Sequence, residues 1–211
     1  MLSRKLPNLI VVAAVLWAAP VLAQSGIPDL NQSIAWTAYE GDDTPTLLVF
    51  PDGLGRPFTE AQLPDGTFVD CTVYLQVRDW NDDPVANFPF EDMWLGSGDG
   101  GLVFCQGGTQ ADVDTDATGT TYWQAPMKGG GFSQALTRVY INGDDSWGEG
   151  LRLSYNSPDI DGDGYVSLPD ISWFAQDLFN GYNFRSDLFR DGMVNLADVA
   201  NLAQGLGGYC P

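Results

Sequence analysis

Residues 159–170 read D-I-D-G-D-G-Y-V-S-L-P-D, with acidic side chains at positions 1, 3, 5 and 12 of a twelve-residue segment and a glycine at position 6. Calcium prefers six to eight hard oxygen ligands, and this spacing supplies them from one short loop. Such a loop turns sharply at position 6, which Gly164 permits. We therefore expect a calcium site, loop 1, with ligands from Asp159, Asp161, Asp163, Tyr165 (its backbone carbonyl), Ser167 and Asp170.

A second copy of this segment, loop 2, begins at Asp187. A shift of 28 residues places Ser157–Leu178 over Arg185–Leu206, and nine of the 22 aligned pairs are identical. Loop 2 has Phe189 where loop 1 has a carboxylate, and Arg190 beside it adds a positive charge. We therefore expect a second, weaker calcium site, with ligands from Asp187, Asp191, Met193 (its backbone carbonyl), Asn195 and Asp198.

Each loop is followed by apolar residues with the spacing i, i+3, i+4, i+7, which predicts an amphipathic helix. The two apolar stripes are Ile171, Phe174, Ala175 and Leu178, and then Val199, Leu202, Ala203 and Leu206. One such helix cannot bury its stripe alone, but two helices related by the repeat can cover each other. Because Pro158 disfavours a helix before loop 1, we expect a small all-α module over residues 157–211 that opens on a calcium loop.

The doubled pattern D-x-D-x-D-G-x-x-x-x-x-D, each copy followed by a helix, resembles the type I dockerin, a duplicated EF-hand-like calcium loop and helix. The resemblance covers roughly the last quarter of the chain. It implies two bound calcium ions and docking onto a cohesin-like module. Position 12 is Asp170 where the general loop ends in Glu, and Phe189 departs at position 3. Positions 10 and 11, often Ser-Thr in cellulosomal dockerins, are Leu168-Pro169 and Leu196-Ala197. The alternative for each loop is an acidic turn without metal.

The start of the chain has the pattern of a secretory signal peptide over residues 1–23. Arg4 and Lys5 precede the apolar run Leu9–Ala19, and small residues favour cleavage after Ala23. The run is too short for an ordinary membrane-spanning helix, although an uncleaved anchor is the alternative. We expect a secreted or extracellular protein with no membrane insertion after cleavage.

Composition excludes several functional classes. The 28 acidic residues against nine Lys and Arg give a formal charge of −19, which repels nucleic acid and anionic membrane surfaces. Hydrophobic residues make up 44% of the chain, so it is not a disordered acidic segment. The chain has no histidine, which excludes Ser-His-Asp and Cys-His catalysis and zinc sites with His ligands. We expect a non-catalytic protein, while a glycosidase that works through paired carboxylates stays open.

Residues 24–156 have the pattern of an all-β domain. Cys71–Val77 alternates between apolar and polar residues, and about eight short runs separated by Gly, Pro and Asp turns favour a β-sandwich. Two phrases, V-R-D…D-P-V at 77–85 and T-D-A-T-G-T-T at 115–121, loosely resemble turns of bacterial immunoglobulin-like domains. The expected fold class is therefore an immunoglobulin-like all-β sandwich followed by a small all-α dockerin module with two calcium loops.

Three cysteines, Cys71, Cys105 and Cys210, allow three single disulfides, each of which leaves one thiol free. Cys71 and Cys105 both fall in strand-like segments of the β domain. We therefore favour the pair Cys71–Cys105, with Cys210 either free or cross-linking the end of the C-terminal module.

Three functions compete. The first is an exported, non-catalytic calcium-binding protein, whose C-terminal module attaches the β domain to a cohesin-like module or an envelope protein. The second is a polysaccharide-associated protein, either a carbohydrate-binding module or a small glycoside hydrolase component, because exposed aromatic rings stack on sugar faces. Trp80 and Trp147 lie in Asp- and Gly-rich turns and are the best candidates for such exposure. The third is a structural calcium module with no partner.

Overall fold

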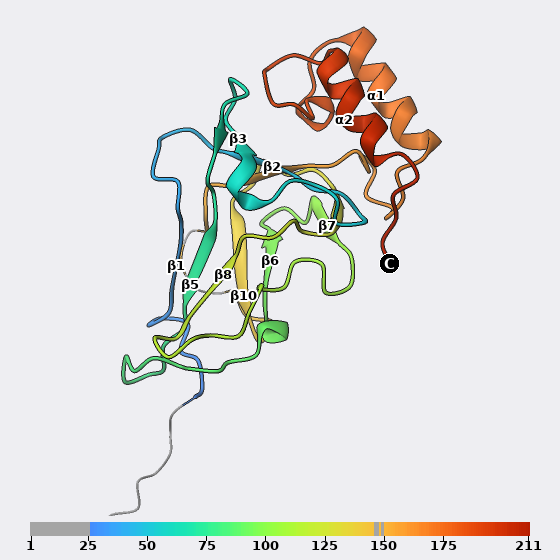
Figure 1. The fold of residues 1–211 in the computed structure, drawn as a ribbon. Helices are drawn as coiled ribbons and strands as arrows, with labels where there is room; N and C mark the ends of the chain where they lie inside the picture. The colour runs from blue at the N-terminus through green and yellow to red at the C-terminus, as the bar shows by residue number, and fades with distance from the viewer. Residues whose placement is uncertain (1–25, 146–147, 149) are drawn as a thin grey trace, which may run out of the picture.

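The structure is a computed structural model that describes residues 26–145, 148 and 150–211, so the predicted signal peptide and Trp147 lie outside the described residues. Within this part, the short strands come first in the chain and the two α-helices come last (Figure 1). The strands are β1 (Ile34–Thr37), β2 (Thr46–Leu48), β3 (Ala61–Gln62), β4 (Phe68–Val69), β5 (Val73–Gln76), β6 (Met93–Ser97), β7 (Leu102–Phe104), β8 (Thr120–Trp123), β9 (Gly129–Gly131), β10 (Thr137–Ile141) and β11 (Ser154–Asn156). The helices are the 3-10 turns η1 (Phe58–Glu60), η2 (Phe90–Asp92) and η3 (Phe184–Ser186) and the α-helices α1 (Leu168–Asn180) and α2 (Leu196–Gly205). No helix in these ranges is both long and apolar enough to cross a membrane.

The strands form four small sheets, in the orders β1-β5-β8, β10-β6, β11-β2-β3-β4 and β7-β9. Every pairing is antiparallel except the parallel pair β11–β2. The alternation predicted along β5 is confirmed, because Val73 and Leu75 are fully buried while Tyr74 and Gln76 are half-buried. The inward residues pack with Trp123 in the larger hydrophobic core of the chain.

The predicted fold class, an immunoglobulin-like sandwich followed by a separate all-α dockerin module, is wrong. Most of the regular structure is small β-sheets, and the described residues hold only two α-helices. The predicted helices do form, but their apolar stripes do not cover each other unaided. Phe174 of α1 and Leu202 of α2 share a second core with Leu48 and Phe50, which come from β2 and the residues after it. A segment whose core is completed by the β part cannot be an independent helical module.

Further contacts tie the C-terminal segment to the strands. Asn156, the last residue of β11, donates from Nδ2 to the carbonyls of Phe184 (2.9 Å) and Asp187 (2.8 Å). Gly205 of α2 lies beside the residues after β2, because a Cβ built on it would be 3.6 Å from the ring of Phe50. Both α-helices therefore lie at the same end of the strands, as Figure 1 shows.

The favoured disulfide Cys71–Cys105 is also wrong, since Cys105 pairs with Cys210 at a Cα–Cα distance of 5.4 Å. Cys71 is free and fully buried, because its side chain faces the core beside β5. Burial, with a smaller contribution from Asp70, raises the pKa of the Cys71 thiol to about 12. The thiol therefore stays protonated and unreactive at neutral pH.

Phe50→Ala tests whether the C-terminal segment depends on the β part. Phe50 is buried in the shared core, so its truncation should lower the free energy of unfolding by about 3–5 kcal/mol. The matched control is Phe179→Ala on α1, where the ring is 84% exposed and the loss should stay under about 1 kcal/mol. Urea unfolding of the full chain measures both values, and equal losses would contradict the shared core.

Candidate metal centre

Loop 1 wraps its backbone around the carboxylate of Asp159, which is fully buried. The amides of Gly162 (3.0 Å) and Asp163 (3.1 Å) donate to Oδ1, and the amide of Gly164 (3.0 Å) donates to Oδ2. Gly162 and Gly164 have φ values of +72° and +88°, in the left-handed region where glycine is unstrained. The glycines therefore allow the tight turn that brings these amides to one side chain.

Asp170 closes the loop from the first turn of α1. Its Oδ1 accepts from the amide of Ile160 (2.7 Å), and its Oδ2 accepts from the amide of Ser167 (2.8 Å). A carboxylate at this position also interacts favourably with the helix dipole. One carboxylate oxygen from each of Asp159, Asp161 and Asp170 lies within 4.8 Å of the others, in a group that could hold a metal ion.

The predicted ligands of loop 1 do not all converge. Asp163 lies outside the group of three and is exposed, and its Oδ1 accepts from the amide of Tyr165 (2.9 Å). Ser167 precedes α1 as its N-cap residue. The ring of Tyr165 stacks on Tyr209, with 6.0 Å between ring centroids. The candidate ligand atom of Tyr165 is therefore its backbone carbonyl oxygen.

The electrostatics of loop 1 favour a cation. Burial raises the pKa of Asp159 to about 6, and the charges of Asp170, Asp163 and Asp161 add to the shift. Burial and then the neighbouring carboxylates also raise the pKa of Asp161. Among the described residues, no lysine or arginine forms an ion pair with loop 1. A divalent cation bound to these oxygens would relieve the repulsion and hold the carboxylates ionised.

Strand β9 packs directly against Asp159, and the sequence analysis did not predict this contact. The amide of Gly131 donates to the carbonyl of Asp159 (2.6 Å), and a Cβ on Gly130 would overlap the Asp159 carboxylate. The sequence signal was the run G-G-G at 129–131, which has no side chain to block this approach. The loop is therefore fixed against the two-stranded sheet β7-β9.

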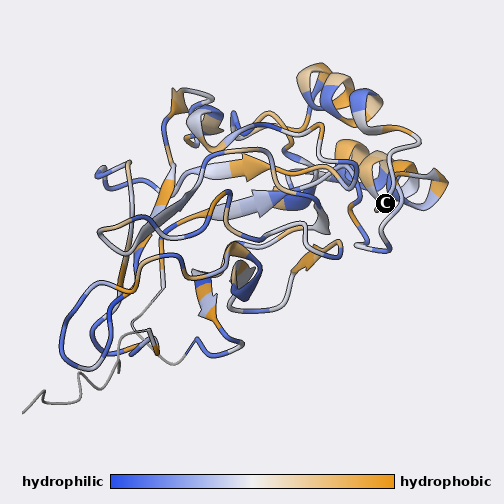
Figure 2. Cartoon of the chain, turned by 60° about the horizontal axis from the view of Figure 1, so that its bottom comes forward, coloured by the Kyte–Doolittle hydropathy of each residue, from blue (hydrophilic) through white to orange (hydrophobic). Residues whose placement is uncertain are grey.

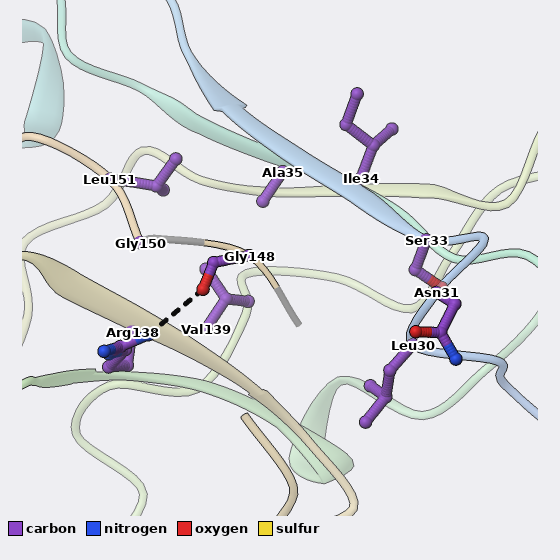
Figure 3. A pocket seen from close by; sticks show the side chains of 10 residues that line it. All are labelled: Leu30, Asn31, Ser33, Ile34, Ala35, Arg138, Val139, Gly148, Gly150 and Leu151. Carbon is purple, nitrogen blue, oxygen red and sulfur yellow. Dashed lines mark hydrogen bonds between the residues drawn. The ribbon is translucent and has the colours of Figure 1, made fainter. Parts of the chain in front are cut away.

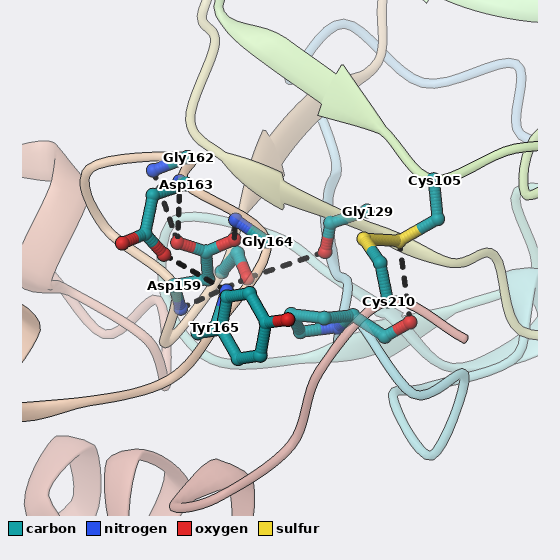
Figure 4. Close-up of a disulfide and its surroundings, with 10 residues drawn as sticks. Cys105, Gly129, Asp159, Gly162, Asp163, Gly164, Tyr165 and Cys210 are labelled. Atoms are coloured by element: carbon teal, nitrogen blue, oxygen red, sulfur yellow. Dashed lines mark hydrogen bonds between the residues drawn. A yellow bond between two sulfur atoms is a disulfide. The ribbon is translucent and has the colours of Figure 1, made fainter.

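The C-terminal tail covers the other side of loop 1, as Figure 4 shows. The amide of Cys210 donates to the carbonyl of Gly164 (2.9 Å), and Tyr209 forms a β-bridge with Tyr165. The disulfide joins this tail to Cys105, the residue after β7. Loop 1 thus lies between the β7-β9 sheet and the tail that is cross-linked to it.

Loop 2 repeats the same backbone arrangement. Asp187 accepts from the amides of Asp191 (3.1 Å) and Gly192 (3.1 Å), and Asp198 accepts from those of Phe189 (2.7 Å) and Asn195 (2.7 Å). Burial, with smaller contributions from Asp187 and Asp191, raises the pKa of Asp198. The predicted ligands Asp187, Asp191, Met193, Asn195 and Asp198 share this backbone arrangement, but the carboxylate group that could hold a metal ion is found in loop 1 alone among the described residues.

A second candidate site is a pocket of about 400 Å³ between β1 and β10. Figure 3 shows Ile34 and Ala35 on one side and Arg138 and Val139 on the other, with Nη1 of Arg138 donating to the carbonyl of Gly148 (3.2 Å). An adjoining pocket of about 490 Å³ shares Ala35, Gly150 and Leu151 with it. Its lining includes Trp36, Tyr39, Glu40, Asp43 and Arg152.

No protein-family model, no curated protein and no solved structure matches this chain. The resemblance to type I dockerins therefore stays a prediction, carried by the residues of the two loops.

The raised pKa of Asp159 makes the stability of the metal-free protein depend on pH. A carboxyl whose pKa is higher in the folded protein than the ordinary 3.8 contributes stability that is complete below about pH 4 and is lost as the pH rises through 6. A shift of about two units corresponds to roughly 2–3 kcal/mol. We therefore expect the metal-free wild type to lose about that much stability between pH 4 and 7 relative to Asp159→Asn.

Urea unfolding in metal-stripped buffer measures this difference. The comparison with Asp159→Asn matters because Asp65, Asp99, Asp116 and Asp177 have lowered pKa values and act in the opposite direction, equally in both proteins. Parallel pH profiles for the two proteins would show that Asp159 titrates normally.

Proposed function

We propose that the protein is an exported, non-catalytic calcium-binding protein that holds its ion in loop 1. The observation that carries the proposal is the group Asp159, Asp161 and Asp170, whose oxygens lie within 4.8 Å of one another without a basic partner among the described residues. These carboxylates would hold the ion, with further oxygens from Tyr165 and Ser167. Hard carboxylate and carbonyl oxygens suit calcium better than softer transition metals.

Calcium bound at loop 1 would stabilise the junction of three parts of the chain. The loop contacts β9 of the β7-β9 sheet through Gly130 and Gly131, and it contacts the tail through the hydrogen bond between Gly164 and Cys210. Because the ion binds the folded loop and not the unfolded chain, it stabilises by mass action. A concentration one hundred times the Kd contributes about 2.7 kcal/mol.

Export is supported by the chemistry of the cysteines. The Cys105–Cys210 disulfide is a cross-link of the kind that persists in oxidising compartments, such as the cell exterior. Free calcium is abundant there, which suits a loop of modest affinity. The signal-like pattern over residues 1–23 supports the same compartment.

Exposed apolar side chains on the helices support attachment to a protein partner. Leu168 and Leu196 occupy position 10 of the two loops and are 75% and 82% exposed. Phe179, at the end of α1, is also exposed, and Figure 2 shows hydrophobic and hydrophilic residues along both helices. A cohesin-like module or an envelope protein is the partner we propose for this surface. A calcium-binding chain that no cohesin captures would instead favour the purely structural role.

Calcium titration of the full chain tests the proposed function. We expect a binding heat and a rise in melting temperature with calcium, both strongly reduced in Asp161→Asn. Asp161 is the informative position because it is exposed and belongs to the group of three carboxylates. The matched control is Asp83→Asn, which removes one exposed acidic charge from a turn between β5 and η2. Equal calcium responses in Asp161→Asn, Asp83→Asn and wild type would rule out binding at loop 1.

Polysaccharide binding is a second candidate function, favoured by the pocket beside the edge strand β1. Trp36 is 40% exposed, lines this pocket near Glu40 and Arg152, and stacks on Tyr74 with 5.5 Å between ring centroids. An indole face can bury a sugar face while charged groups bind the hydroxyls. Trp80, which the sequence pointed to, is also exposed.

Trp36→Ala tests the second candidate. If the protein binds insoluble polysaccharide, this change should lower its affinity at least tenfold, about 1.4 kcal/mol, in a depletion assay. Trp173→Ala, which removes an equally exposed indole on α1, should keep the wild-type affinity. Equal loss in the two variants, or no retention of wild type, would remove the polysaccharide function.

A further inference from the structure

We infer that loop 2 takes no calcium because the guanidinium of Arg190 occupies its cation position, so the chain binds one calcium ion rather than two. The total of one ion per chain rests on the proposed function, calcium binding at loop 1. The contacts of loop 2 carry it independently.

Arg190 neutralises the first carboxylate of loop 2. Its Nη1 lies 3.4 Å from Oδ2 of Asp187 and donates to the hydroxyl of Tyr182 (3.1 Å). That hydroxyl donates in turn to the same Oδ2 (3.1 Å). The Asp187 side chain is fully buried, whereas Arg190 is 14% exposed. In loop 1 the corresponding Asp159 has backbone donors, and no described lysine or arginine forms an ion pair with it.

The structure holds the guanidinium in place from two further sides. Nε of Arg190 donates to Oγ1 of Thr46 in β2 (3.0 Å), and the guanidinium carbon lies 5.0 Å from the ring centroid of Phe184. Arg190 has a φ of +56°, and Gly162 has +72° at the same position of loop 1. A side chain in this strained region persists only where its surroundings compensate, and these contacts supply the compensation.

Two other predicted ligands of loop 2, Asp191 and Asn195, contact each other. Nδ2 of Asn195 donates to Oδ2 of Asp191 (3.2 Å), and the amide of Met193 donates to Oδ1 (3.0 Å). Phe189, at position 3, offers no oxygen. Its ring lies against Gly66 and 5.9 Å from the guanidinium of Arg56. The two residues that break the calcium pattern therefore both contact the β part.

The two loops thus share one backbone arrangement but obtain their positive charge from different sources. Loop 1 needs a cation from solution, whereas loop 2 carries its cation in the chain and is fixed to β2 whether or not calcium is present. We expect calcium removal to loosen loop 1 and the tail, and to leave the contacts of Arg190 with Asp187 and Thr46 unchanged.

The test is the calcium stoichiometry of the full chain by calorimetry, with calcium alone as the probe. Wild type should bind one ion. Phe189→Asp/Arg190→Gly converts loop 2 to the D-x-D-G-D-G order of loop 1 and should bind two, the second within about tenfold of the first in affinity. Arg152→Gly, which removes an arginine whose guanidinium donates to the carbonyls of Gly41 and Asp42, is the control and should bind one.

The measured number of bound ions separates a failure of the inference about loop 2 from a failure of the proposed function at loop 1. Two ions in wild type, reduced to one by Asp198→Asn, would overturn the inference. So would a folded double variant that still binds one ion. If the double variant does not fold, wild-type stoichiometry and Arg190→Lys decide, because the lysine variant keeps the cation and should also bind one ion. No ion in wild type would contradict the proposed function at loop 1, and a single new ion in the double variant would still support the inference.

Discussion

Electrostatic repulsion among the carboxylates of loop 1 is the constraint on which the C-terminal architecture depends. Three of these side chains present oxygens within 4.8 Å of one another, and Asp159 among them is fully buried. Several parts of the chain hold this unfavourable arrangement together: backbone amides of the loop, the glycines of β9, the tail with Tyr209, and the Cys105–Cys210 disulfide. A cross-linked frame that concentrates negative charge is preorganised for a cation, because little further ordering is needed when the ion binds.

The two loops have the same backbone arrangement but differ in how the negative charge of their aspartates is compensated. Both use backbone amides at positions 5 and 6 to bind the first aspartate and place the last aspartate at the start of a helix. No lysine or arginine among the described residues forms an ion pair with loop 1, where we propose an external ion, whereas Arg190 forms an ion pair with Asp187 of loop 2. Arg190 also binds the loop to Thr46 of β2, so α2 is anchored to the strands without metal. The net stability that a buried ion pair of this kind adds is small, because the desolvation of the two charges offsets their attraction.

The local features of the C-terminal segment could be predicted from the sequence. The acidic spacing located Asp159, Asp161 and Asp170, and the apolar periodicity located α1 and α2. The errors concern contacts between residues far apart in the chain. Cys105 and Cys210 are 105 residues apart, and nothing local indicates that the tail reaches β7. Phe50 packs in the core under the helices, and Gly130 lies against the carboxylate of Asp159. Both contacts join residues that are far apart in the chain. Arg190 could be recognised as an extra charge, but its role depends on Thr46 and Tyr182.

A crystal structure of the full chain grown with calcium would test the central claim most directly. We expect anomalous density for one ion in loop 1, bound by Asp159, Asp161 and Asp170, with the guanidinium of Arg190 still in contact with Asp187 in loop 2. An ion in loop 2 with the Arg190 guanidinium displaced would contradict the division of tasks between the loops. A loop 1 without an ion at saturating calcium would contradict calcium binding itself.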